Sequence, residues 1–205
     1  MNNNKYIIEV YDNLFNHDML ESLSDYAENL TWNFGDRYTD DDPFSLQFWG
    51  CPIMTNNDLF IENHDSLPTS IFECKNIVQD VWSKIKSQKT VNDLNLSVNT
   101  IIVNGQSYGQ EGGIHKDHGS ENKNSSGGRF TVVLYLNRKW HPTWQGETML
   151  YNNSGTDIVK AVVPNPGRVL FFDARIPHQA RPPHRLIDDL RMTMAFHLSN
   201  DLNHS

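Results

Sequence analysis

The amino-acid sequence predicts an α+β protein with a jelly-roll core, a cupin-like barrel also called a double-stranded β-helix. Apolar residues in the first half recur at helical spacing, whereas short apolar or alternating runs separated by turn residues follow from residue 94 onward. Strands that come after helices favour helices packed on the outside of a sheet. We therefore expect a single domain over residues 1–205, with helical support over about 16–90 and the jelly-roll core over about 94–198.

The first half contains one strand-like run and two amphipathic helical segments. Residues 6–10 are β-branched and aromatic and predict a first strand. Asn16 or Asp18 is a candidate cap for the first helix, and residues 70–86 predict the second. Residues 32–52 are aromatic but irregular, which predicts a solvated loop, with a substrate-covering lid as the alternative. We expect the helices to support the sheet and to carry no catalytic residue.

Six strand-like segments follow in the second half. Each is short, and Gly, Pro, Asn or Asp separates it from the next. The run 119–128 is rich in Ser, Asn and Gly, so it predicts a mobile surface loop. The predicted strands are Leu94 to Val103, Arg129 to Leu136, Glu147 to Tyr151, Ile158 to Val163, Arg168 to Phe172 and Arg191 to Leu198.

The composition of the chain limits the cellular compartments and the classes of binding partner that we expect. The chain has 205 residues, and its two cysteines, Cys51 and Cys74, are too few for a disulfide framework. No apolar run approaches the roughly 20 residues of a membrane span, and the N-terminus lacks a signal-peptide pattern. The formal net charge of −8 argues against a general nucleic-acid binder, which neutralises phosphates with Lys and Arg. We expect a cytoplasmic protein with no membrane and no nucleic-acid partner.

Three residues of the second half form a candidate metal site. His115 and Asp117 are separated by one residue, so in an extended segment their side chains point the same way. His178 follows a predicted strand and offers a third ligand. Two imidazoles and one carboxylate that leave positions open are the protein ligands of non-haem Fe(II) oxygenases. Asp173 and Gln179 are candidates to orient the histidines.

An arginine begins the last predicted strand. Arg191 lies on the polar face of RMTMAFHL, where polar and apolar residues alternate. If that face lines a barrel, the buried guanidinium requires an anionic partner, and its planar fork suits a carboxylate. Arg185, in the preceding RPPHRLIDD segment, is the competing cation. We favour Arg191 because only this arginine begins an alternating strand.

In combination, these motifs resemble the Fe(II)/2-oxoglutarate-dependent dioxygenases, and within them the prolyl 4-hydroxylase-like group. The resemblance covers about residues 98–198 and rests on HKD, then YLN, QGE and GRVLFFD, and finally the arginine of the last strand. The iron ligands and catalytic residues that it implies are His115, Asp117 and His178. The 2-oxoglutarate contacts that it implies are Arg191, Tyr135 and Thr131. Tyr108 and Asn104 are alternative candidates for one further co-substrate contact.

The resemblance implies an enzyme that uses Fe(II), 2-oxoglutarate and O2, with ascorbate as a candidate accessory. Such an enzyme would hydroxylate an unactivated C–H bond of a small-molecule or peptidyl substrate, prolyl or otherwise amino-acid-like, and release succinate and CO2. Three alternatives stay open: a small-metabolite oxygenase of the same superfamily, a nucleic-acid demethylase, which the net charge disfavours, and a non-catalytic cupin-like sensor. Asp117 argues against a halogenase, which needs a small residue in place of the carboxylate.

Overall fold

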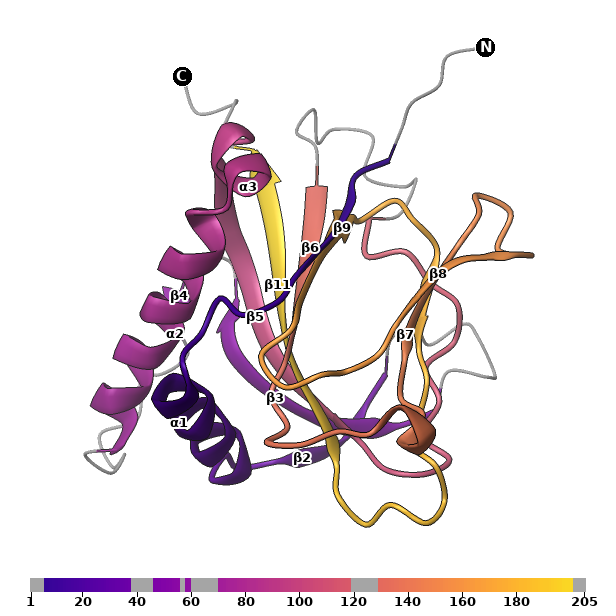
Figure 1. The fold of residues 1–205 in the computed structure, drawn as a ribbon, viewed down its shortest axis with the longest axis horizontal. Coiled ribbons are helices and arrows are strands. Elements are labelled where there is room, and N and C mark those ends of the chain that lie inside the picture. Colours follow the sequence, from indigo (N-terminus) through magenta and orange to yellow (C-terminus); the bar gives the residue numbers. More distant parts are fainter. Residues whose placement is uncertain (1–5, 38–45, 56–57, 60–69, 119–128, 201–205) are drawn as a thin grey trace.

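The computed structural model describes residues 6–37, 46–55, 58–59, 70–118 and 129–200. Helices lie on one side of a large curved sheet, and a smaller group of strands stands opposite it (Figure 1). The elements in chain order are β1 (Ile8–Tyr11), α1 (His17–Glu28), β2 (Asn33–Asp36), β3 (Phe48–Thr55), β4 (Asp58–Leu59), α2 (Ser70–Lys86), α3 (Lys89–Asp93), β5 (Leu96–Gln106), β6 (Arg129–Tyr135), the 3-10 helix η2 (Pro142–Trp144), β7 (Thr148–Tyr151), β8 (Ile158–Val162), β9 (Val169–Asp173), β10 (His178–Ala180) and β11 (Arg191–Asn200).

The described strands form two antiparallel sheets. The larger has the order β1-β9-β6-β11-β5-β3-β2, with β4 paired to β3, and the smaller has the order β10-β7-β8. Strands adjacent in space are often distant in sequence, so β11 lies between β5 and β6. This arrangement confirms the predicted α+β class with a jelly-roll core. No helix in the described part of the chain has the length and apolar character needed to cross a bilayer.

Strand β11 separates the apolar core from the interior of the barrel. Residues on its outward face are buried among side chains of α1, α2 and the large sheet, namely Met192, Met194, Phe196 and Leu198. Residues on its inward face line a cavity, namely Arg191, Thr193, Ala195 and His197. Each large apolar side chain buried on the outward face contributes roughly 1.5–3 kcal/mol. The core therefore fixes which residues of β11 face the cavity.

The two main helices pack on the outer face of the large sheet, as the sequence predicts. Helix α1 begins after Asn16, whose side chain accepts a hydrogen bond from the Met19 amide at 3.0 Å, so Asn16 rather than Asp18 is the cap. Helix α2 covers the predicted residues 70–86, and its Trp82 stacks on Phe196 of β11 with ring centroids 5.9 Å apart. These helices hold the sheet but stand behind it, away from the cavity.

The prediction of an irregular loop over residues 32–52 is wrong for the part that the structure describes. Strands β2 and β3 lie there and extend the large sheet beyond β5, so the region of helical support also contributes strands. Pro52 masks the β3 signal in the sequence; it sits where the pairing with β5 shifts register, a position that tolerates a missing N–H. Residues 38–45 and the predicted loop 119–128 lie outside the described residues.

Candidate active site

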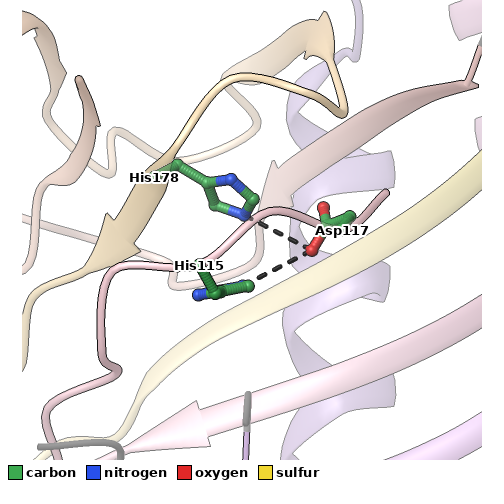
Figure 2. A group of neighbouring side chains, drawn as sticks. All are labelled: His115, Asp117 and His178. Atoms are coloured by element: carbon green, nitrogen blue, oxygen red, sulfur yellow. Dashed lines mark ion pairs between the residues drawn. The ribbon is translucent and has the colours of Figure 1, made fainter. Parts of the chain in front are cut away.

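A short backbone pairing brings two histidines together from segments distant in sequence. The amide of His115 donates to the carbonyl of His178 at 3.0 Å, and the amide of His178 donates to the carbonyl of His115 at 2.9 Å. Their ring centroids lie 4.3 Å apart. In Figure 2 both side chains lie beside Asp117, whose Oδ1 is 3.4 Å from Nε2 of each ring. Among the described residues, these three form a group able to hold a metal ion.

Backbone carbonyls set the orientation of both rings. Nδ1 of His115 lies 2.9 Å from the Gly113 carbonyl, and Nδ1 of His178 lies 3.0 Å from the Ile176 carbonyl. Because a carbonyl oxygen only accepts, each Nδ1 carries the proton and donates it. In the neutral form of each ring, Nε2 therefore carries the lone pair and lies on the side of Asp117, as a metal ligand requires.

Asp173 and Gln179, which the sequence suggested as groups that orient the histidines, form hydrogen bonds with other side chains. The carboxylate of Asp173 accepts hydrogen bonds from Arg175, and the amide oxygen of Gln179 accepts one from Tyr151. Sequence reasoning missed the carbonyls because any residue can supply one. The reciprocal pairing of the two histidine backbones decides which carbonyls lie close enough.

The electrostatics of the three residues favour a divalent cation. Burial raises the pKa of the Asp117 carboxyl, but the adjacent His178 and His115 outweigh it and hold that pKa well below its usual range. Burial likewise lowers the pKa of His178, yet the Asp117 carboxylate outweighs it and the pKa of His178 ends above its ordinary value. The carboxylate is thus ionised and attracts positive charge, which either a proton on His178 or a metal ion supplies.

We therefore expect the metal affinity to decrease as the pH is lowered, and the decrease should begin at a higher pH than for a histidine with an ordinary pKa. Metal binding needs neutral His178, whose pKa is raised, so affinity is full above that pKa and drops about tenfold per pH unit below it. Zn(II) titrations across the pH range measure this curve. The Asp117→Asn variant removes the group that raises the pKa, so its weaker binding should begin to fall at a lower pH. An identical midpoint in both proteins would contradict the coupling.

Thr131 supports the metal site through Asp117. Its hydroxyl donates to Asp117 Oδ2 at 2.5 Å, which leaves Oδ1 directed at the two imidazoles. Thr131 lies on β6 opposite His197 of β11, and both residues line the cavity. The sequence-based expectation made Thr131 a co-substrate contact, whereas the structure directs its hydroxyl to a candidate metal ligand.

The isosteric change Thr131→Val tests these two roles. Loss of a hydrogen bond that orients a metal ligand typically weakens metal affinity by roughly 10- to 100-fold. We expect that loss in Zn(II) titrations, with 2-oxoglutarate affinity at saturating metal changed by less than about threefold. A change in 2-oxoglutarate affinity with unaltered metal affinity would instead support a co-substrate contact. Ser24→Ala, which removes a buried hydroxyl bonded to the Leu136 carbonyl on the helix side, is the matched control.

A cavity of about 260 Å³ extends from the candidate metal ligands to Arg191. Arg191 is 1% exposed, and its guanidinium donates to the Gly146 carbonyl at 2.6 Å, to Gln106 Oε1 at 3.1 Å and to Thr148 Oγ1 at 2.9 Å. All three partners are neutral, so within the described residues this buried cation lacks a carboxylate. Gly146 has φ of +84°, and a Cβ there would lie 3.2 Å from Arg191 Cδ, so glycine makes room for the arginine. An anionic ligand in the cavity would complete the site.

Tyr135 is not among the residues that line the cavity, but it contacts Thr148, which is. Its hydroxyl donates to Thr148 Oγ1 at 2.7 Å, and the Arg191 guanidinium stands 5.5 Å from the centre of its ring. Burial raises the pKa of the Tyr135 hydroxyl, while nearby Arg191 opposes the shift, so the group keeps its proton. Thr148, which sequence reasoning missed, lines the cavity. Since Thr148 Oγ1 accepts from both Tyr135 and Arg191, its own proton is available to a ligand.

The alternatives left open by the sequence occupy different environments. Arg185 is exposed, whereas Arg191 is buried in the cavity wall. Tyr108 is 62% exposed, whereas Asn104 is buried and lines the cavity. Gln106, two residues beyond Asn104 on β5, contacts Arg191 and was not among the predicted site residues. The geometry therefore favours Arg191 and Asn104 over their competitors.

Comparison with known proteins shows the superfamily. Residues 102–198 match the family model of the 2OG-Fe(II) oxygenase superfamily, and this segment contains the three candidate metal ligands and Arg191. Residues 102–198 therefore carry a 2OG-Fe(II) oxygenase domain. This oxygenase is an oxidoreductase, and its superfamily uses Fe(II), 2-oxoglutarate and O2. No curated protein sequence matches the chain.

Solved structures similar to this oxygenase have the same fold at low sequence identity. A prolyl hydroxylase from Trichoplax adhaerens, in complex with a hypoxia inducible factor peptide fragment, has a TM-score of 0.61 at 17% identity, over 99% of this chain and 90% of that one. A Pseudomonas putida prolyl-4-hydroxylase has a TM-score of 0.61 at 15% identity, over 97% and 94%. The non-heme alpha ketoglutarate dependent epimerase SnoN from nogalamycin biosynthesis has a TM-score of 0.64 at 10% identity, over 97% and 80%.

The residues of the candidate site fit an iron ion. Two Nε2 atoms and one carboxylate oxygen are the donor set of a facial triad. Donors about 2.1 Å from a metal and at right angles to one another lie about 3.0 Å apart, close to the 3.4 Å between Asp117 Oδ1 and each Nε2. The buried cation that a dicarboxylate requires lines the same cavity. When bound, Fe(II) and 2-oxoglutarate supply the oxidising chemistry by activating O2.

Proposed function

We propose that this oxygenase hydroxylates an unactivated C–H bond of a prolyl or other amino-acid-like substrate. In such a reaction one oxygen atom of O2 enters the substrate as a hydroxyl group. The other enters 2-oxoglutarate, which loses CO2 and becomes succinate. The main support is that the metal ligands and the buried Arg191 share one cavity. The prolyl substrate class rests on the fold shared with two prolyl hydroxylases.

The chain's own residues divide the work between metal and co-substrate. In this proposal His115, Asp117 and His178 hold Fe(II) and leave the cavity side open. Arg191 neutralises the distal carboxylate of 2-oxoglutarate, and the Thr148 hydroxyl donates a hydrogen bond to the same carboxylate. Because these residues hold the distal end of the co-substrate, its metal-binding end keeps a fixed position relative to the metal ion.

A substrate screen tests the proposal. Purified protein with Fe(II), ascorbate and O2 is incubated with 2-oxoglutarate and separate sets of prolyl peptides, free amino acids, small metabolites and oligonucleotides, and succinate is measured over the background without substrate. We expect stimulation by an amino-acid-like compound and a product heavier by one oxygen atom. A product of unchanged mass and altered stereochemistry would identify an epimerase instead. Stimulation by oligonucleotides alone would favour the demethylase, and no succinate under any condition would favour a sensor.

A further inference from the structure

A second cavity, of about 330 Å³, meets the first at the candidate metal ligands. The two cavities share Asp117, Thr131 and His197. From there the first cavity continues along β5 and β11 toward Asn104 and Arg191. The second continues toward the opposite ends of these strands and is lined there by Asn99, Thr100, Arg129 and Leu198. The metal site thus stands between a cavity that suits the co-substrate and another that is open to a second molecule.

Arg129 is the cation of the second cavity and has no partner within the described residues. It is half-buried, and neither a hydrogen bond nor an ion pair joins its side chain to another described residue. The neighbouring Arg175 differs, because Asp173 Oδ1 accepts from its Nε at 2.9 Å and neutralises it. Asp117 is the carboxylate that lines the second cavity, but it faces the two histidines and Thr131. A half-buried guanidinium without an anion favours binding one.

The other polar groups of this cavity also favour an acceptor ligand. Asn99 Oδ1 accepts a hydrogen bond from the Ser199 hydroxyl at 3.0 Å, whereas its amide NH2 has no hydrogen-bond partner among the described residues and can donate to a ligand. His197 lines both cavities and makes no hydrogen bond to another described side chain. On the sheet, the backbone of His197 pairs with Thr131 on one side and Thr100 on the other, and His197 lines both cavities together with Asp117. A guanidinium, an amide NH2 and an imidazole N–H on one side of the candidate metal site can thus donate hydrogen bonds to a ligand.

We propose that Arg129, Asn99 and His197 form a subsite for a carboxylate group of the primary substrate, which holds that molecule with a C–H bond facing the metal. This inference rests on the proposed hydroxylation of an amino-acid-like substrate and narrows it to compounds with a free carboxylate, such as a free amino acid. A neutral prolyl residue inside a peptide lacks that group. One guanidinium balances one carboxylate, whereas a phosphate dianion would leave excess negative charge beside Asp117.

The position of the subsite separates the two carboxylic acids that the reaction needs. Arg191 and His197 are six residues apart on β11, which corresponds to about 20 Å along the strand. A carboxylate at Arg191 and another at Arg129 therefore lie toward opposite ends of the barrel, with the metal ligands between them. The surface as a whole does not attract anions, because the formal net charge is −8. Any preference for carboxylates would therefore come from this local site.

A binding experiment tests the subsite without turnover. Protein loaded with redox-inert Zn(II) and saturated with 2-oxoglutarate, which occupies Arg191, is titrated calorimetrically with the common free L-amino acids, proline included, and with their carboxamides. We expect at least one free amino acid to bind and its carboxamide to bind at least tenfold more weakly. Arg129→Gln should weaken binding of the free acid by roughly 10- to 100-fold, as for the loss of a charge-assisted hydrogen bond, and leave 2-oxoglutarate affinity unchanged.

Two further variants separate the subsite from general effects. Arg185→Gln removes the same charge at an exposed position that does not line either cavity, so it should bind the amino acid as the wild type does. Asn99→Ala should weaken binding by a smaller factor than Arg129→Gln. Equal binding of acid and carboxamide, an Arg129→Gln variant with wild-type affinity, binding of inorganic phosphate but no carboxylate, or no binding by any amino acid would each overturn the proposal.

Failure of the subsite and failure of the proposed function give different results. Zn(II) supports no oxidation, so carboxylate binding that depends on Arg129 can be found even if hydroxylation is absent. Conversely, succinate release stimulated equally in wild type and Arg129→Gln by a peptide with an amidated C-terminus and no acidic residue would sustain hydroxylation and overturn the subsite.

Discussion

His178→Ala is expected to abolish iron-dependent turnover of 2-oxoglutarate. The ring supplies one of the three candidate metal ligands, and its Nε2 faces Asp117 at 3.4 Å. Two remaining ligands should hold the metal far more weakly, by more than the roughly 10- to 100-fold that follows loss of a group that only orients a ligand. Succinate release measures the activity, and Zn(II) titration measures the metal affinity. Succinate release and metal affinity should decrease together, because loss of the same ligand causes both effects.

Folding must be separated from ligation in this variant. The His178 ring packs edge-on against Phe172, with centroids 4.8 Å apart, so alanine also removes packing from the barrel interior. Circular dichroism and thermal unfolding of the metal-free proteins measure that contribution. His17→Ala, at an exposed position at the start of α1, is the control that should keep full activity and metal affinity. Wild-type succinate release from folded His178→Ala would contradict the metal site.

The strands and the HxD pair of the candidate metal site could be proposed from the sequence because their signals are local. Alternation in RMTMAFHL assigns Met192 and Arg191 to opposite faces of one strand, and the structure confirms both assignments. His115 and Asp117, two positions apart, also lie on the same side of the chain, with Nε2 and Oδ1 3.4 Å apart. Helix α2 was also predictable, because its apolar residues recur at helical spacing over seventeen residues.

The rest of the site depends on pairing between distant strands, which no local pattern encodes. Arg191 lies opposite Gln106 because β11 and β5 pair in one particular register, and a shift of one residue would turn Gln106 away. Thr148 reaches Arg191 from the second sheet. Tyr135 was assigned to the co-substrate from the resemblance, but Thr148 stands between its hydroxyl and the cavity. The face of each strand was predictable, whereas its partners across the barrel were not.

Replacing Arg191 by glutamine is expected to remove most of the binding of 2-oxoglutarate while the metal still binds. The guanidinium is a cation buried among neutral partners, and loss of one member of a buried charge pair costs about 2–5 kcal/mol of binding free energy. That corresponds to a rise in Kd of roughly 30- to 4,000-fold. Calorimetric titration of the Zn(II)-loaded protein with 2-oxoglutarate measures it. Zn(II) affinity should be unchanged, because Arg191 contacts none of the three ligands.

Thermal unfolding gives a second readout that does not depend on catalysis. A ligand present at 100 times its Kd stabilises the folded state by about 2.7 kcal/mol, whereas a ligand present at its Kd stabilises it by about 0.4 kcal/mol. A variant with 100-fold weaker affinity therefore loses most of the rise in melting temperature that 2-oxoglutarate gives the wild type. Arg191→Lys keeps the charge but not the planar fork, so its rise should be intermediate.

Arg185→Ala decides between the two arginines of the C-terminal region. Arg185 is exposed and does not line the cavity, so its loss should leave both the melting shift and the Kd for 2-oxoglutarate at wild-type values. If Arg185→Ala abolished the shift and Arg191→Gln preserved it, the last strand would have been assigned to the wrong co-substrate ligand. If neither variant changed the shift, 2-oxoglutarate would bind elsewhere, and the cation buried at Arg191 would serve the fold alone. The expected result ties the co-substrate to Arg191, which is buried in the wall of the cavity that the candidate metal ligands also line.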